Sequence, residues 1–207
     1  MNCEPVSGSG HWLATMTREE LLDVLRRSGA LLDGHFRLSS GLHSTGFVQL
    51  ALVLQYPGKA EQLGRSIAEC TVSLRPTVVL SPALGGVVIG HEVGRALGVR
   101  AMFAERQDGV LKLRRGFELA ASDRVLVVED VVTTGGSTRE TMQVATAEGA
   151  GVVGVAAIVN RNGGPLPFDV PFHPLLEMSL PTYQPDVCPM CQQGVPVVKP
   201  GSRPMAT

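Results

Sequence analysis

Two acidic residues stand directly before a run of threonine, glycine and serine in the segment VLVVEDVVTTGGST. The carboxylates of Glu129 and Asp130 can accept hydrogen bonds from neighbouring sugar hydroxyls, or bind a hydrated Mg²⁺ ion. The pair Gly135–Gly136 permits a tight turn with exposed N–H groups, and Ser137 or Thr138 is placed to cap a helix whose N-terminus favours an anion. The segment therefore predicts a cradle for a ribose 5-phosphate.

Known nucleotide-binding motifs and a plain helix cap fit this segment less well. An apolar strand that ends in acids occurs in P-loop proteins, but the chain contains no G-x-x-x-x-G-K-[ST] sequence. A dinucleotide-binding turn would need G-x-G-x-x-G, which is absent here. A purely structural helix cap would explain the glycines and Ser137, but it gives no reason for two adjacent acids.

The elements around this segment predict an α/β fold. From residue 77 apolar, β-branched runs at 77–80, 99–104, 124–129 and 151–160 alternate with helical stretches at 85–98 and 137–150. Continuous apolar strands are typical of a sheet covered on both faces, and the strand–helix alternation indicates mostly parallel strands. Ligands of such sheets bind beyond the carboxyl ends of the strands, which is where the acids lie.

The rest of the chain supplies two earlier helices and a late strand. The segment MTREELLDVLRRSGALL predicts a first helix with a capping box of Thr17 and Glu20 and an exit at Gly29, and residues 58–74 predict a second. The proline-rich end predicts one strand within 170–180. We expect a single domain over residues 17–198, with flexible termini at 1–16 and 199–207.

Composition limits the class of protein. The 207 residues are 44% hydrophobic and 18% charged, which is ordinary for a globular protein with one sizeable core. The formal net charge of -1 provides no global field for nucleic acid or anionic membrane, so we expect neither partner. No apolar run approaches a membrane span and the N-terminus does not have the pattern of a secretory signal, which favours a cytoplasmic protein.

The segment VLVVEDVVTTGGST resembles the phosphoribosyl pyrophosphate (PRPP) signature of type I phosphoribosyltransferases. The resemblance implies that a nucleophile displaces pyrophosphate at C1 of PRPP in the presence of Mg²⁺, which the substrate mainly holds, with no protein metal site. Glu129 and Asp130 would hold the ribose hydroxyls and act in catalysis. The implied PRPP-binding residues also include Val131, Val132, Thr133, Thr134, Gly135, Gly136, Ser137 and Thr138.

Three further segments resemble the orotate-specific members of that family. GHFRLSSGLHSTGFVQ resembles their N-terminal F-x-L-x-S-G-x-x-S segment, and SPALGGVVIGHEVGRAL their G-P-A-x-x-G-I segment. The segment AIVNRNGG places an arginine after a late strand, where the family has one. The resemblance implies the family's fold, with a small hood formed by both termini, and implies that Thr133, Arg161, Ser40 and His43 bind orotate.

The segment FAERQDGVLKLRRGF resembles the flexible catalytic loop of this family, which reaches into the neighbouring subunit of a homodimer. Its cations would close over PRPP and neutralise the leaving pyrophosphate; they are Arg106, Lys112, Arg114 and Arg115, of which Arg106 and Lys112 are the expected catalytic pair. A solvated basic hairpin remains the alternative. The chain departs from many family members at Ser39, Gly85 and Glu105.

The sequence CPMC at 188–191 has several interpretations. A C-x-x-C sequence can be half a zinc site or a redox pair, but zinc takes about four ligands and there is no second such pair. A site shared across a dimer stays open. From the sequence we expect no metal there.

These features predict orotate phosphoribosyltransferase activity in de novo pyrimidine (UMP) synthesis, with orotate and PRPP as substrates. A purine or xanthine phosphoribosyltransferase would share the PRPP segment, but not LSSGLHS or Arg161. A PRPP-sensing regulator without catalysis would need a DNA-binding appendage, for which the residues before the first helix are too few. A binding module unrelated to PRPP is a third alternative.

Overall fold

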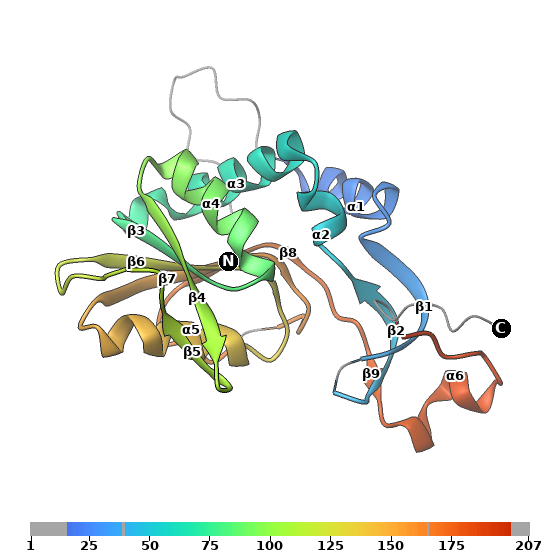
Figure 1. The fold of residues 1–207 in the computed structure, drawn as a ribbon. Helices are drawn as coiled ribbons and strands as arrows, with labels where there is room; N and C mark the ends of the chain where they lie inside the picture. Colours follow the sequence, from blue (N-terminus) through green and yellow to red (C-terminus); the bar gives the residue numbers. More distant parts are fainter. Residues whose placement is uncertain (1–15, 39, 165, 200–207) are drawn as a thin grey trace.

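The computed structural model describes residues 16–38, 40–164 and 166–199. They form an α/β fold with a large six-stranded sheet and a smaller three-stranded sheet beside it (Figure 1). The predicted flexible termini lie almost wholly outside the described residues, and so does Ser39. None of the described helices is both long enough and apolar enough to cross a membrane.

The large sheet has the strand order β5-β4-β3-β6-β7-β8. All its neighbouring strands are parallel except β4 and β5, which form an antiparallel pair at one edge. This confirms the predicted mostly parallel sheet. The strands are β3 (Val78–Pro82), β4 (Arg100–Gln107), β5 (Val110–Leu113), β6 (Arg124–Val132), β7 (Gly151–Asn160) and β8 (Phe172–Glu177).

Both faces of the large sheet are covered, which explains the continuous apolar strands. On β6, Leu126 and Val128 belong to one buried cluster, whereas Val125 and Val127 belong to another on the opposite face. The first cluster contains residues of α1 (Arg18–Arg27), α3 (Pro57–Thr71) and α4 (Gly85–Leu97), and the second contains Ala145 of α5 (Gly136–Ala147). Successive side chains of a strand point to opposite faces, so a doubly covered strand is apolar throughout.

The predicted helix signals are present with small shifts of their ends. Thr17 and Glu20 form the capping box of α1: the Thr17 hydroxyl accepts from the Glu20 N–H at 3.2 Å, and the Glu20 carboxylate accepts from the Thr17 N–H at 2.8 Å. The second predicted helix is α3 followed by a 3₁₀ turn at Val72–Leu74. A short helix, α2 (Ala51–Leu54), was not predicted.

The smaller sheet forms the hood that the family resemblance implied. It has the order β1-β2-β9, from β1 (Leu31–Arg37), β2 (His43–Val48) and β9 (Thr182–Tyr183), and the short helix α6 (Pro189–Gln192) follows. Elements from the early and the late parts of the sequence therefore meet in it, as the blue strands β1 and β2 and the red-to-orange elements β9 and α6 of Figure 1 show. We use "hood" for these four elements.

Candidate functional site

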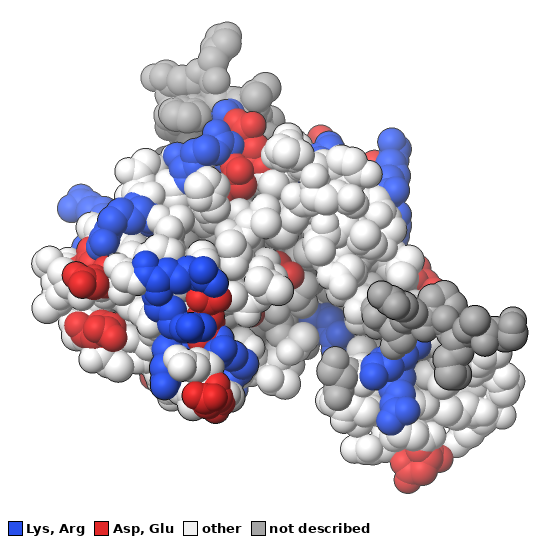
Figure 2. All heavy atoms as spheres, in the orientation of Figure 1, with Lys and Arg blue, Asp and Glu red and all other residues white. Residues whose placement is uncertain are grey.

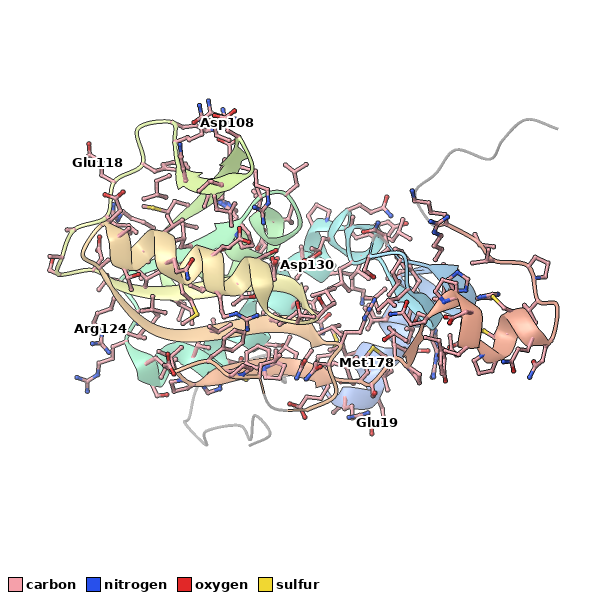
Figure 3. All side chains as sticks on the ribbon, turned by 90° about the horizontal axis from the view of Figure 1, so that it is seen from below. Glu19, Asp108, Glu118, Arg124, Asp130 and Met178 are labelled. Atoms are coloured by element: carbon pink, nitrogen blue, oxygen red, sulfur yellow. The ribbon has the colours of Figure 1, made fainter. Side chains whose placement is uncertain are left out.

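The two acids lie inside strand β6 rather than after it. The sequence predicted that the strand would end at 129, but β6 continues to Val132 and remains paired with β7, where Val132 lies opposite Asn160. The loop that follows is therefore short, covering Thr133, Thr134 and Gly135 before α5 begins at Gly136. Figure 3 shows Asp130 at the end of the sheet nearest the hood and Arg124, which begins β6, at the far end.

The N-terminus of α5 is open in a way that the sequence did not predict. Its N-cap residue is Gly135 with φ +75°, and none of the described side chains caps the helix, so the expected caps from Ser137 and Thr138 are wrong. A positive φ is a conformation that glycine adopts at little cost. Backbone N–H groups of the first turn thus lack a side-chain acceptor, which suits an anion there.

Arg139 supports this threonine–glycine loop, and sequence reasoning missed it. Its Nη2 donates a hydrogen bond to the carbonyl of Thr134 at 2.9 Å, whereas its buried Nη1 has no hydrogen-bond partner among the described atoms. A Cβ added at Gly135 would lie 3.1 Å from that Nη1 and 2.9 Å from the ring of Phe168. The guanidinium of Arg139 thus fixes the loop through its Nη2 atom, and its Nη1 atom remains able to donate a hydrogen bond. A cation one turn after the glycines was the available signal.

Within the carboxylate pair Glu129 is buried and Asp130 is partly buried, and neither forms an ion pair with a described cation. Glu129 is 9% exposed, and none of the ion pairs among the described residues includes either acid. Burial raises the pKa of Glu129 to about 8, and the neighbouring charge of Asp130 adds to this rise. Burial also raises the pKa of Asp130, whose Oδ1 accepts a hydrogen bond from the Val131 N–H at 2.8 Å. Carboxylate oxygens that are desolvated and have no ion-pair partner favour the binding of a polyol or a hydrated cation.

Glycines at the start of α4 make room for the carboxylate pair. A Cβ added at Gly85 would lie 2.7 Å from Oδ1 of Asp130, and one added at Gly86 would lie 2.9 Å from Oε2 of Glu129. The turn from β3 into α4 therefore lies against the acids, a contact that the sequence did not predict. Asp130 also lines a hollow of about 360 Å³ between α2 and α4. The other residues that line it are Gln49, Ala51, Leu54, Gln55, Leu84, Gly85 and Val88.

Arg161 lies at the same end of the large sheet as the carboxylate pair, where the parallel strands have their carboxyl ends. It directly follows β7, and its N–H donates to the carbonyl of Val132 at 2.8 Å. Partial burial lowers the pKa of its guanidinium. Asn160, which we did not predict, shapes this turn: its side-chain amide donates to the carbonyl of Gly164 at 3.0 Å and accepts from the N–H of Asn162 at 3.1 Å.

The four predicted loop cations lie on and after the β4–β5 hairpin. Figure 2 shows a group of Lys and Arg side chains in this region, with acidic residues among them. Arg106 donates to the carbonyl of Gly109 at 2.7 Å and pairs with Glu140 of α5 at 2.8 Å, so the hairpin leans on the helix that follows the threonine–glycine loop. Arg115 pairs with Glu105 at 2.8 Å, and Lys112 lies opposite Glu105 in the hairpin register.

The two hood residues predicted to bind orotate have different surroundings. Ser40 is exposed in the turn between β1 and β2. His43 is buried, and its Nδ1 lies 2.8 Å from Nε2 of His35 and 3.3 Å from Sγ of Cys191. The structure thus gathers Glu129, Asp130, the threonine–glycine loop and Arg161 at the carboxyl ends of β6 and β7. In contrast, it surrounds the Nδ1 atom of His43 with other side chains of the hood.

Comparison with known proteins assigns the family. The model of the phosphoribosyl transferase domain matches residues 57–176, which include the carboxylate pair and the threonine–glycine loop. An orotate phosphoribosyltransferase of Heliobacterium modesticaldum is 51% identical over 191 residues, which cover 91% of this chain and 100% of the relative. The chain belongs to the orotate phosphoribosyltransferase family.

Two more orotate phosphoribosyltransferases agree with this assignment. The enzyme of Caldanaerobacter subterraneus subsp. tengcongensis is 47% identical over 188 residues, covering 91% of this chain and 99% of its own. The crystal structure of Mycobacterium tuberculosis orotate phosphoribosyltransferase in complex with inorganic phosphate has a TM-score of 0.63 and 25% identity. It covers 78% of this chain and 95% of that chain. The type I phosphoribosyltransferase fold expected from the sequence is confirmed.

Proposed function

We propose that this member of the family transfers the 5-phosphoribosyl group of PRPP to orotate, giving orotidine 5-monophosphate and pyrophosphate in de novo UMP synthesis. The observation that carries the proposal is the buried carboxylate pair, which lacks a cation of its own among the described residues and stands beside the open N-terminus of α5. Such a pair suits a ligand that brings hydroxyls and positive charge together with a phosphate. The identity to orotate-specific relatives supports orotate as the base.

The threonine–glycine loop suits the 5-phosphate of PRPP. Thr133, Thr134 and the first turn of α5 offer hydroxyls and backbone N–H groups, and Arg139 stiffens the loop through the Thr134 carbonyl. The phosphate found in the mycobacterial relative shows that this relative binds such an anion. We assign the 5-phosphate to residues 133–138, with Val131 and Val132 as the strand that sets the loop in place.

The carboxylate pair suits the ribose. As the C1–O bond to pyrophosphate breaks and the bond from N1 of orotate to C1 forms, positive charge builds on the ring, and the proton of N1 passes to the departing pyrophosphate or to water. The positive charge of the ring would lower the raised pKa of Glu129, so that both carboxylates are ionised as the reaction proceeds, favour that charge and bind the ring hydroxyls. The acidic oxygens also fit a hydrated Mg²⁺, which, when bound with PRPP, would offset the charge of the diphosphate.

The hairpin cations suit the diphosphate leaving group, and Arg161 suits the carboxylate of orotate. Arg106, Lys112, Arg114 and Arg115 can be brought over the diphosphate if the hairpin exchanges its present ion pairs for the substrate. Arg161 can pair with the orotate carboxylate through its planar fork, with Ser40 and Thr133 as further polar groups. We leave His43 out of this set because of its neighbours in the hood. A homodimer that shares the hairpin, and a cytoplasmic location, complete the proposal.

The test is base selectivity. Purified protein with Mg²⁺ and PRPP is mixed in turn with orotate, hypoxanthine, adenine and xanthine, and the loss of each base is followed by absorbance. We expect consumption of orotate alone. Consumption of a purine would overturn the assignment of the base, and binding of PRPP without turnover of any base would support the non-catalytic regulator instead.

A variant of Arg161 sharpens the test. Arg161→Leu should raise KM for orotate by about 10–100-fold, the range expected when a charged hydrogen bond is lost, and should change KM for PRPP much less. Arg27→Leu, an exposed arginine of α1, is the matched control and should change neither. An equal rise of both KM values would show that Arg161 supports the site as a whole and does not contact orotate.

A further inference from the structure

Four metal-ligand side chains meet inside the hood, from segments far apart in the sequence. His35 comes from β1 and His43 from β2, whereas Cys188 is the N-cap residue of α6 and Cys191 lies within that helix. One ligand atom from each residue lies within 4.8 Å of all the others. The histidines supply the second half of the site that the C-x-x-C pair lacked in the sequence. We call these four residues the Cys/His cluster.

The distances between the ligand atoms are close to those of a tetrahedral zinc site. Sγ of Cys188 lies 3.5 Å from Nε2 of His35, and Sγ of Cys191 lies 3.7 Å from that nitrogen and 3.3 Å from Nδ1 of His43. Zinc bonds of about 2.3 Å to sulfur and about 2.0–2.1 Å to nitrogen at tetrahedral angles place S and N about 3.5–3.6 Å apart. The two nitrogens, at 2.8 Å, need only a small separation to reach about 3.4 Å.

A backbone hydrogen bond on the side away from the cluster also orients the His35 ring. Nδ1 of His35 donates to the carbonyl of Val195 at 2.8 Å, which leaves Nε2 as the nitrogen with a lone pair toward the cluster. The backbone of His35 is fixed as well, because its carbonyl accepts from the Val198 N–H at 2.8 Å. An outer hydrogen bond that sets the tautomer is typical of histidines that bind metal.

The burial of three of the four residues and their ligand types favour a metal site over a redox pair. His35, His43 and Cys188 are at most 6% exposed, while Cys191 is exposed. A redox-active C-x-x-C pair requires no second histidine beside it, and two neutral imidazoles need only one hydrogen bond to satisfy each other. Neither alternative explains why four soft or borderline ligands converge with no carboxylate among them, which is the donor set of structural zinc.

We propose that the Cys/His cluster binds one Zn²⁺ ion within a single subunit, as a closed structural site with two thiolates and two imidazoles. All four positions are filled by protein, so the site has no open position for catalysis. The ion ties the segment around α6 to both β1 and β2. It is separate from the Mg²⁺ that accompanies PRPP, and the proposal does not rest on the proposed function.

The first test is the metal content of the full-length protein. Protein purified without added metal or chelator should carry about one zinc per chain by inductively coupled plasma mass spectrometry, in keeping with the high affinity of such sites. Cys188→Ser and His35→Gln should each lower this content to about a tenth or less. His91→Gln, an exposed histidine of α4, is the matched control and should keep the full content.

A second measurement keeps the proposal testable if these variants fold poorly. Wild-type protein stripped with a chelator under reducing conditions and refilled with Co²⁺ should show thiolate-to-cobalt charge transfer and the intense visible bands of tetrahedral cobalt. The proposal is overturned if the reduced wild type takes up neither metal, if Cys188 and Cys191 form a disulfide and bind no zinc once reduced, or if Cys188→Ser retains its zinc. None of these readings depends on catalytic activity.

Discussion

The carboxylate pair and the Cys/His cluster are both largely buried groups of polar side chains, but the first lacks protein partners for its charge whereas the second consists of four mutually close ligands. The acids of β6 have no cation among the described residues, and burial raises the pKa of Glu129 to about 8. The hood cluster instead surrounds its centre with four ligand atoms of the protein itself. The first arrangement is costly until a substrate arrives, whereas the second is closed and suited to holding structure. We therefore expect loss of charge at the acids to lower activity without lowering stability, and loss of the cluster to lower stability.

The largest expected effect is on turnover. Asp130→Asn keeps the shape of the side chain but removes the charge beside the ribose, so kcat should fall by about 10²–10⁴-fold. The unfolding midpoint in urea should stay the same or rise, because burial disfavours the charged form of Asp130. Asp33→Asn, an exposed acid of β1, is the control. Unchanged turnover in the folded variant would remove Asp130 from the site.

The pH dependence of stability should be of intermediate size. The ordinary pKa of Glu129 is 4.5 and its folded value is about 8, so between these values the folded protein holds a proton that the unfolded chain has lost. Stability contributed by this group should therefore fall as pH rises from 4.5 to 8, by an amount on the order of a few kcal/mol. Urea unfolding of the substrate-free protein measures it.

Glu129→Gln provides the comparison for that measurement. Glutamine does not titrate, so the variant should lose most of this decline and be more stable than the wild type near pH 8. Parallel pH profiles for the two proteins would mean that water or a cation reaches Glu129 in solution. The contrast between the open acids and the closed cluster would then be small.

The smallest expected effect concerns the glycines at the start of α4, which lie against the acids. Gly86→Ala would place a Cβ 2.9 Å from both Oε2 of Glu129 and the carbonyl of Val128, and overpacking of this kind costs about 1–3 kcal/mol of stability. Gly58→Ala, near the start of α3, meets nothing within 4 Å and should be neutral or slightly stabilising. Equal stability of the two variants would show that the turn into α4 can relax, and that the acids do not depend on it.

The two regions also differ in how much of them the sequence could predict. The carboxylate pair, the threonine–glycine loop and α5 are consecutive, so local patterns predicted their neighbourhood and the family. The errors there were local too: pairing with β7 carries β6 on to Val132, and Gly135 takes the N-cap position from Ser137 and Thr138. Sequence patterns do not report how far a neighbouring strand extends.

The hood was beyond the reach of such patterns. Its strands β1 and β2 contain histidine, glycine and serine, and β2 also pairs with the two-residue strand β9 from late in the sequence, so no apolar periodicity marked them. Counting cysteine pairs alone argued against a metal, because the two histidines are 148, 153 and 156 residues away in the three contacts that they make with the cysteines. Arg139 and Asn160 were missed for a related reason, since their roles are hydrogen bonds to loop backbone.

The hood combines early strands with late elements of the sequence, which has a consequence for biosynthesis. Every strand of the large sheet has been made by residue 177, so the body of the enzyme can fold while the ribosome still holds the remainder. β9, α6 and the segment to Val198 that pairs with His35 and Arg37 emerge last. A chain interrupted just before these residues would therefore carry a complete sheet and an unfinished hood, with two imidazoles facing water.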